Sequence, residues 1–149
     1  KPIKTSISPM LAVLDTNHFR VVAEGGALAS RIALRAEKQD VEVLLSIITV
    51  QEATGGWLGL INGIKAGRDQ VNAYASFQKT INVFQRFGVL PFDEIAAEHF
   101  HRLRSEHLRV GSMDLKIAAI CLAHGATLLT RNLADFTGIA GLRVKNWLD

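Results

Sequence analysis

The sequence predicts an α/β fold with three layers, α/β/α, built on a mainly parallel sheet of four to five strands. Hydrophobic runs of strand length alternate along the chain with longer segments of helical periodicity. No linker, internal repeat or low-complexity tract divides the 149 residues, which suffice for one domain with a core. We expect a single domain over residues 10–149, preceded by a leader or cloning remnant at residues 1–9.

The first half of the chain predicts two strands and three helices. The apolar run 11–14 is a short buried strand, and helical patterning follows from about 28 to 39. The run 41–48 is rich in β-branched residues and predicts the second strand. A helix should begin near Thr49 and end by Gly55-Gly56. The segment 65–87 predicts a long helix, because apolar side chains recur there at spacings of three and four.

The second half continues the alternation of strand and helix. Residues 88–91 predict a third short strand, and Asp93 is a candidate N-cap for a helix that reaches about residue 108. The segment 112–124 predicts a helix closed by Gly125. Residues 127–130 predict a fourth strand, and 142–144 are a candidate fifth.

Four acids stand where strands end or helices begin: Asp15, Glu52, Asp114 and Asp135. Each has an ordinary explanation alone. Asp15 suits an Asx-turn or N-cap, Glu52 a capping box begun by Thr49, Asp114 the first turn of a helix capped by Ser112, and Asp135 a solvated loop.

Together, the four acids predict a site for a divalent cation. Open α/β sheets bind ligands beyond the carboxyl ends of their strands, where these acids would gather. Two carboxylates about 4 Å apart repel by roughly 4 kcal/mol at an effective dielectric of 20, so cations would be needed to hold them together. Oxygen donors without a Cys or His cluster favour Mg²⁺ or Mn²⁺ over zinc.

Composition indicates a cytoplasmic protein without a membrane segment. No apolar run approaches the length of about 18 residues that a membrane-spanning helix needs, and no signal-peptide pattern is present. The single cysteine, Cys121, fits a reducing compartment. The formal charge of +3 is a mild indication of a polyanionic partner.

Several segments resemble the PIN domain, and within it the VapC-type toxin ribonucleases of bacterial toxin–antitoxin pairs. The likeness runs in order from Met10 to Asp149. It is carried by Leu14-Asp-Thr-Asn17, the helix start with Glu52, Val89-Leu-Pro-Phe-Asp93, Gly111-Ser-Met-Asp-Leu-Lys-Ile-Ala-Ala119, Ala123-His-Gly-Ala-Thr-Leu-Leu-Thr-Arg-Asn132 and Gly141-Leu-Arg-Val.

The resemblance implies an endoribonuclease dependent on Mg²⁺ or Mn²⁺, with one or two ions, that hydrolyses RNA phosphodiesters with a metal-activated water. Carried over by position, the catalytic metal-binding carboxylates would be Asp15, Glu52, Asp114 and Asp135. Residues that would orient ligands or water are Asn17, Thr130 and Asn132. Many PIN domains have an acid where this chain has Asn132, so whether Asp135 or Asn132 completes the site stays open.

The resemblance also implies partners, namely an RNA substrate, a cognate antitoxin and a second copy of the chain in a homodimer. Candidate RNA-binding cations are Arg131, Lys116 and Arg109. One alternative is a catalytically inactive PIN-like binding module. Another is a Mg²⁺-dependent phosphatase with Asp15 as nucleophile, which is disfavoured because Asn17 stands where such enzymes usually carry a second Asp. A small-molecule binder of the flavodoxin or Rossmann type is disfavoured by the lack of a glycine-rich phosphate loop.

Overall fold

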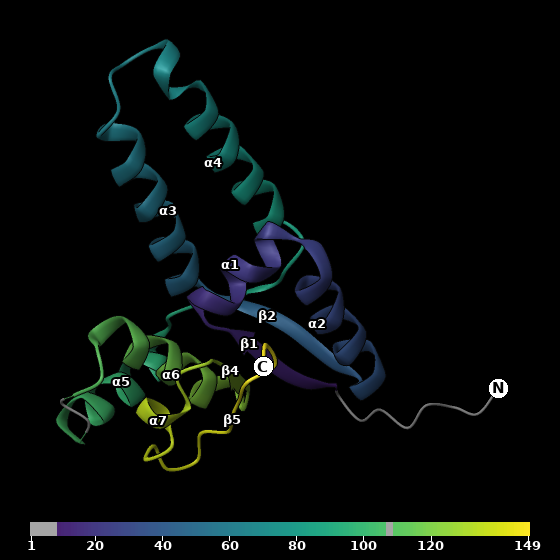
Figure 1. The fold of residues 1–149 in the computed structure, drawn as a ribbon. Helices are drawn as coiled ribbons and strands as arrows, with labels where there is room; N and C mark the ends of the chain where they lie inside the picture. Colours follow the sequence, from purple (N-terminus) through teal and green to yellow (C-terminus); the bar gives the residue numbers. More distant parts are fainter. Residues whose placement is uncertain (1–8, 107–108) are drawn as a thin grey trace.

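The sheet is fully parallel and has five strands in the order β3-β2-β1-β4-β5. We analysed a computed structural model, which describes residues 9–106 and 109–149 (Figure 1). The predicted leader, apart from Pro9, and the predicted helix end at residues 107–108 lie outside the described residues. The strands are β1 (Met10–Leu14), β2 (Val41–Ser46), β3 (Val89–Leu90), β4 (Thr127–Leu129) and β5 (Val144–Lys145).

Seven α-helices and one short 3₁₀ helix, η1 (Arg68–Gln70), lie between the strands in the described part of the chain. The α-helices are α1 (Thr16–Glu24), α2 (Gly26–Gln39), α3 (Ile47–Asn62), α4 (Val71–Phe84), α5 (Glu94–Glu106), α6 (Ser112–His124) and α7 (Leu133–Phe136). None of the helices among the described residues combines the length and apolar character that crossing a membrane requires.

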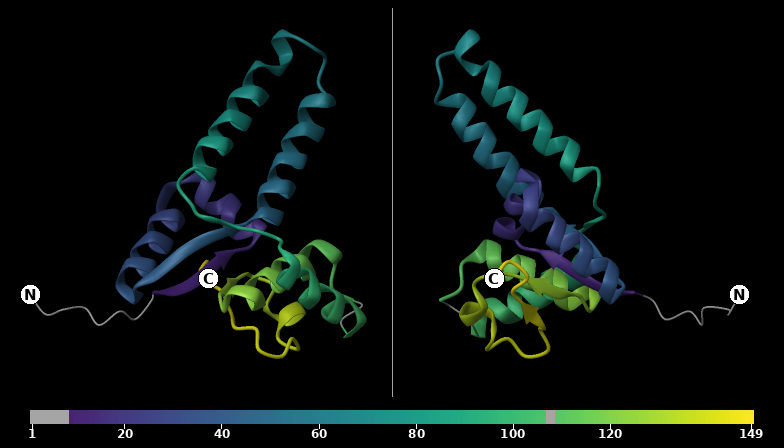
Figure 2. Two further views of the ribbon diagram at one scale, coloured as in Figure 1. Left: turned by 180° about the vertical axis from the view of Figure 1, so that it is seen from behind. Right: turned by 45° about the vertical axis from the view of Figure 1, so that its right-hand side comes forward.

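Helices cover both faces of the sheet, which confirms the predicted α/β class and its three layers (Figure 2). Alternate strand residues point to opposite faces. Val13 and Leu128 pack in one core cluster with α5 and α6, whereas Leu14 and Leu129 pack in a second cluster with α1 and α2. The sheet therefore separates two hydrophobic cores.

Helices α3 and α4 form a long hairpin that projects away from the sheet (Figure 1). Several large apolar side chains on the hairpin are exposed, among them Leu58 and Leu60 on α3 and Val71, Tyr74 and Ile81 on α4. At the base of the hairpin, Phe84 stacks on Phe19 of α1, with ring centroids 5.1 Å apart. The hairpin is thus anchored at its base and open to solvent along its length.

Several sequence-based boundaries in the first half of the chain were wrong, although the end of β1, the end of α2 and the start of β2 lie where they were predicted. Helix α1 was not predicted, and α2 begins at the Gly25-Gly26 turn, where both residues have positive φ. Helix α3 begins at Ile47 and continues through Gly55-Gly56 to Asn62 instead of ending at the glycines. The predicted long helix is shorter and is preceded by η1.

In the second half, Ser112–His124 is helical as predicted and Gly125 closes it with φ 63°. One detail differs, because Gly111 and not Ser112 occupies the N-cap of α6. Asp93 caps α5 as predicted, its carboxylate accepting the Ala96 N–H at 2.9 Å.

Candidate active site

The candidate site lies between β1 and β4, where the order in which the chain adds strands to the sheet reverses. The chain proceeds from β1 outward through β2 to β3 on one side, and β4 then pairs with the other side of β1. In open parallel sheets this switch point leaves a crevice at the carboxyl ends of the strands. Asp15 follows β1 directly, and its N–H donates to the Leu129 carbonyl of β4 at 3.0 Å.

Asp15 is buried and its carboxylate is fixed by the start of α1. It caps this helix, with Oδ1 accepting the His18 N–H at 2.8 Å. Burial by itself would raise the pKa of Asp15, but the donors of His18 and the Thr130 hydroxyl outweigh burial and hold that pKa below its ordinary value. The carboxylate is therefore ionised and held in one orientation.

Glu52 reaches toward α1 instead of folding back on its own helix. Its Oε1 accepts the Thr16 hydroxyl at 2.7 Å, and Thr16 Oγ1 lies 3.3 Å from Thr49 Oγ1. The predicted capping box is wrong, since Ser46 caps α3 by accepting the Thr49 N–H at 3.2 Å. This contact places Glu52 beside the residue that follows Asp15.

Asp114 stands in the first turn of α6 and is half-buried. Burial raises the pKa of Asp114, and the negative charges of Glu52, Asp15 and Asp135 raise it further. All three predicted partners therefore lie within electrostatic reach of Asp114. Elements that are far apart in the sequence bring the four acids into one region.

Asp135 is exposed on the short helix α7 and is joined to Asn132 by a hydrogen bond from the Asn132 side-chain amide. The Asn132 N–H in turn donates to the buried Thr130 hydroxyl at 3.0 Å. Thr130 thus links the turn after β4 to Asp15. Both candidates for the fourth position, Asp135 and Asn132, lie in this one hydrogen-bonded turn, whereas Asn17 is exposed on α1.

The donor set fits a hard cation that keeps much of its water. Among residues 9–106 and 109–149, no three acidic, His or Cys side chains converge closely enough to hold a metal ion directly. Mg²⁺ is commonly bound by one or two carboxylates and several waters, so this spacing suits it better than it suits zinc. Such a cation would offset the repulsion among these carboxylates, which contributes to the raised pKa of Asp114.

The three predicted RNA-binding cations are distributed around this region. Arg131 is partly exposed and its Nε lies 3.3 Å from Asp149 Oδ2. Lys116 extends over the Phe100 ring, with Nζ 5.7 Å from the ring centroid. Arg109 is exposed just before α6. A phosphate that binds Arg131 would therefore compete with the carboxylate of Asp149.

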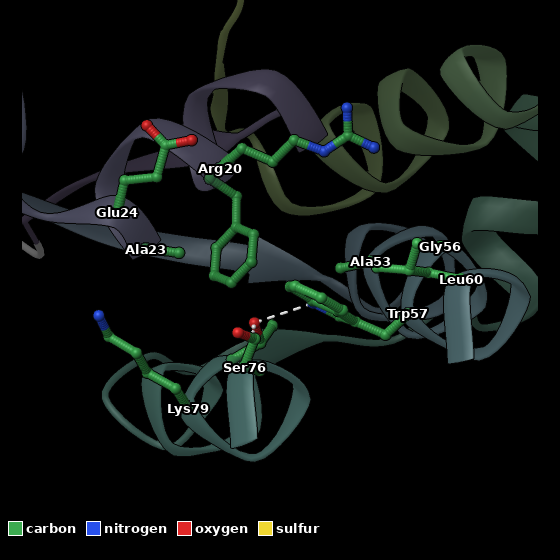
Figure 3. A pocket seen from close by; sticks show the side chains of 11 residues that line it. Arg20, Ala23, Glu24, Ala53, Gly56, Trp57, Leu60, Ser76 and Lys79 are labelled. Carbon is green, nitrogen blue, oxygen red and sulfur yellow. Dashed lines mark hydrogen bonds between the residues drawn. The ribbon is translucent and has the colours of Figure 1, made fainter. Parts of the chain in front are cut away.

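A cavity of about 460 Å³ opens between α1, α3 and α4, and none of the four acids is among the residues that line it. Figure 3 shows Trp57 among the lining residues, where the indole Nε1–H donates to Thr80 Oγ1 at 3.0 Å and joins the two helices of the hairpin. Phe19 and Ala53 contribute apolar surface to the lining, while Arg20, Glu24 and Lys79 contribute charge. Phe19 follows Asp15 by four positions in the sequence, and Ala53 directly follows Glu52.

Sequence reasoning missed two residues that touch the predicted ligands. Thr16 holds Glu52, and the buried His18 lies against Asp15. The signal for Thr16 was its place inside the Leu14-Asp-Thr-Asn17 segment. The signal for His18 was its spacing of three from Asp15, which puts both in the first turn of a helix.

Comparisons with known proteins agree with this architecture. The PIN domain family model matches residues 12–142. Similar curated proteins include the tRNA(fMet)-specific endonuclease VapC of Shigella flexneri, 35% identical over 66 residues that cover 42% of this chain and 50% of that protein. Ribonuclease VapC1 of Rickettsia felis is 39% identical over 62 residues, covering 39% of this chain and 46% of that protein. The chain thus spans about half the length of the curated relatives that it matches.

Solved structures with a similar fold cover nearly the whole chain. One is VapBC2 from Rickettsia felis bound to a DNA fragment from its promoter, with a TM-score of 0.72 and 24% identity over 93% of this chain and 99% of that one. VapBC-1 from nontypeable Haemophilus influenzae has a TM-score of 0.73 and 24% identity over 94% of this chain and 100% of that one. The family model extends from within the first strand nearly to the last, and on that ground the chain belongs to the PIN domain family.

Proposed function

We propose that the chain is a Mg²⁺- or Mn²⁺-dependent endoribonuclease and the toxin of a toxin–antitoxin pair. Membership of the PIN family and the similarity to proteins named VapC support a nuclease of this group. In this proposal Asp15, Glu52, Asp114 and Asp135 would hold one or two ions, in part through the water molecules that the ions keep.

One observation carries the proposal, namely that the charges of three acids act on a fourth, Asp114, at the switch point of the sheet. Burial raises the pKa of half-buried Asp114, and the negative charges of Glu52, Asp15 and Asp135 raise it further. Holding like charges close together in the folded state lowers the free energy of unfolding. A divalent cation between them would remove that cost, which is the simplest reason to assemble them.

The chain's residues have distinct parts in the proposed reaction. A bound Mg²⁺ or Mn²⁺ supplies a more acidic water and offsets the negative charge that develops on the phosphodiester. Asp15 and Glu52 each have one carboxylate oxygen held by a donor, the His18 N–H and the Thr16 hydroxyl, and each would offer its other oxygen to the cation. Thr130 and Asn132 keep the turn that carries Asp135 in place.

RNA is the substrate that the charge distribution and the relatives favour. A cluster of acids repels a polyanion unless cations lie nearby, and the candidate cations are Arg131 after β4, Lys116 within α6 and Arg109 before α6. Contacts of this kind position a backbone and do not read its sequence.

The test is cleavage of a mixed RNA pool by the purified chain. We expect cutting with Mg²⁺ or Mn²⁺, none with EDTA, and a loss of at least about 100-fold in Asp15→Asn and in Asp114→Asn. Asp69→Asn is the matched control, because Asp69 is an exposed acid in η1, at the far end of the hairpin.

Three outcomes would contradict the proposal. Equal cutting by all variants would indicate a contaminating nuclease and remove the assignment of Asp15 and Asp114. Cutting that persists in EDTA would overturn metal dependence. No cutting and no Mn²⁺ binding by the unmodified chain would favour the inactive PIN-like binding module.

An antitoxin segment in the cavity between α1, α3 and α4 is the second part of the proposal. The similar structures named above are VapBC complexes. The apolar lining of the cavity with flanking charges suits an amphipathic segment (Figure 3). A segment seated there would contact Phe19 of α1 and Ala53 of α3, the helices that carry the residues next to Asp15 and Glu52.

Two exposed leucines on α3 provide a matched test of this cavity. Leu60 lines it and Leu58 does not, although both are about half exposed. We expect Leu60→Glu to weaken antitoxin binding about tenfold or more in titration calorimetry and Leu58→Glu to leave it unchanged. Equal affinity of the two variants would rule out this cavity as the binding site.

A homodimer is the third part, and the exposed apolar side chains of the hairpin support it. Sedimentation equilibrium of the purified chain should give twice the mass of 16.3 kDa. A monomer at micromolar concentration would contradict it.

A further inference from the structure

The imidazole of His18 is buried beside Asp15, one of the proposed metal ligands. The proposed reaction gives this side chain no role. It has no exposed surface, and it lies in the first turn of α1 after Asp15. Its Nδ1 atom is 3.3 Å from Asp15 Oδ1. Its Nε2 atom accepts the backbone N–H of Trp147 at 3.3 Å, a contact across 129 positions of the sequence. His18 therefore connects the segment after β5 to the end of β1.

The contact with Trp147 determines which nitrogen of His18 carries hydrogen. A backbone N–H is only a donor, so the nitrogen that faces it is an acceptor without hydrogen. The single hydrogen of the neutral ring is therefore assigned to Nδ1, which faces Asp15. The backbone N–H of His18 already donates to Oδ1 of the same carboxylate at 2.8 Å. Two donors of one residue thus converge on one oxygen of Asp15.

The second donor is not fully engaged in this structure. Among the described residues, His18 Nδ1 has no aligned hydrogen-bond partner, although Asp15 Oδ1 is 3.3 Å away. A buried donor without a partner is rare and calls for an explanation. A small rotation of the Asp15 carboxylate, such as coordination through Oδ2 would impose, would complete the bond.

We propose that His18 is a positioning residue for Asp15: it holds Oδ1 so that Oδ2 faces the cation, and the Trp147 backbone fixes the imidazole that does so. This inference rests on the proposed metal-dependent nuclease. Groups that orient a metal ligand typically change metal affinity about 10–100-fold when they are removed. The segment Asn146–Asp149 thereby acts on a site whose ligands all precede it in the sequence.

Two isosteric substitutions separate this role from simple packing. In His18→Asn the amide NH₂ takes the place of Nδ1, which keeps a donor for Asp15 and loses the acceptor for Trp147. In His18→Gln the terminal amide reaches the place of Nε2, which keeps the acceptor for Trp147 and loses the donor for Asp15.

The measurement is Mn²⁺ affinity by titration calorimetry, together with the melting temperature of the metal-free protein. We expect His18→Gln to bind Mn²⁺ about tenfold or more weakly, while His18→Asn stays within about threefold of the unmodified chain. We expect the reverse order for loss of melting temperature, with His18→Asn less stable than His18→Gln. In an Asp15→Asn background, His18→Gln should have no further effect on Mn²⁺ affinity, since His18 acts through Asp15.

Two results would overturn the inference and are distinguishable from failure of the proposed function. If the unmodified chain binds Mn²⁺ and His18→Gln binds it equally well, His18 has no positioning role and the metal site stands. If affinity falls in both variants in proportion to their loss of melting temperature, His18 only packs the fold. Absence of Mn²⁺ binding by the unmodified chain would overturn the proposed function and this inference together.

Discussion

Helices α6 and α4 are nearly equal in length, with 13 and 14 residues, but they are held in the molecule in different ways. Six residues of α6 between Leu115 and Cys121 are buried, and five of them have at most 1% exposed surface. Helix α4 buries only Ala73, Thr80 and Val83. The first helix belongs to the core, and the second presents surface to solvent.

The candidate site lies where these two kinds of structure meet. Asp114 comes from the buried helix α6, whereas Glu52 comes from α3, which begins at the sheet and extends into the hairpin. A rigid core can hold an acid at a fixed place, and an exposed hairpin can offer a surface to a partner beside it. The contrast between core helix and exposed hairpin suggests four experiments.

The largest expected effect comes from deleting buried volume in α6. Ile120 has no exposed surface, so Ile120→Ala should lower the free energy of unfolding by about 3 kcal/mol. The same substitution on the hairpin, Ile81→Ala, should cost less than about 1 kcal/mol in the monomer, unless the proposed homodimer covers this side chain, because Ile81 is 39% exposed in the single chain. Urea denaturation measures both. Equal costs would mean that the hairpin is covered in solution.

A smaller loss is expected where the hairpin is joined to α1. Thr16→Val keeps the side-chain shape and removes the hydroxyl that holds Glu52. We expect a decrease of about 1 kcal/mol in the free energy of unfolding and about tenfold weaker Mn²⁺ binding. Thr137→Val is the control, since that exposed hydroxyl contacts only a neighbouring carbonyl among the described residues. Unchanged Mn²⁺ affinity in Thr16→Val would show that Glu52 needs no support.

Replacing Asp114, the acid on the core helix α6, with a neutral residue should stabilise the metal-free protein. Burial and the charges of Glu52, Asp15 and Asp135 raise the pKa of Asp114 in the folded state, so the folded protein loses stability as pH rises through that pKa. At pH 7 without metal, Asp114→Asn should melt about 2–4 °C higher, which corresponds to about 1 kcal/mol. The difference should vanish at a pH where Asp114 is protonated.

Asp15 has the opposite linkage, and it provides the control. Its pKa is lowered in the folded state, so its contribution is present above its ordinary pKa and is lost as pH falls through the lowered value. Asp15→Asn should therefore not stabilise the metal-free protein. A gain in melting temperature for Asp15→Asn, or none for Asp114→Asn, would contradict this division between the two acids.

The smallest effect is expected at a glycine inside α3. A Cβ on Gly55 would meet nothing within 4 Å, and the residue is in the interior of a helix. Gly55→Ala should raise the free energy of unfolding by about 0.5–1 kcal/mol, because alanine loses less backbone entropy. Thermal denaturation checks this. A loss of stability would mean that the exposed side of α3 packs against another chain in solution.

The sequence predicted elements best where local signals and burial agree. Helix α6 has an apolar run and a glycine at its left-handed end, and its bounds were predicted without error. The prediction that a helix ends at Gly55-Gly56 was wrong, because each glycine costs a helix only about 1 kcal/mol. Ile61 is buried beyond them, and Trp57 binds Thr80, so tertiary contacts outweigh that cost.

The candidate site was predictable in its acids but not in its supports. Carboxylates after strands are a pattern along the sequence, because parallel strands end at one edge. The pairing of Glu52 with Thr16 and of His18 with Trp147 depends on which strands are neighbours. Spacing alone holds no such information, so the sequence did not reveal that Glu52 pairs with Thr16 instead of folding back in a capping box.

The strand order has a consequence for the making of this protein. The central strand β1 is synthesised first, but its neighbour β4 and the acids Asp114 and Asp135 follow more than half a chain later. Translation adds about 5–20 residues per second, so an emerging chain passes seconds with an incomplete sheet. If the protein cuts RNA as proposed, the ribosome that makes it faces no assembled site until those last acids have emerged.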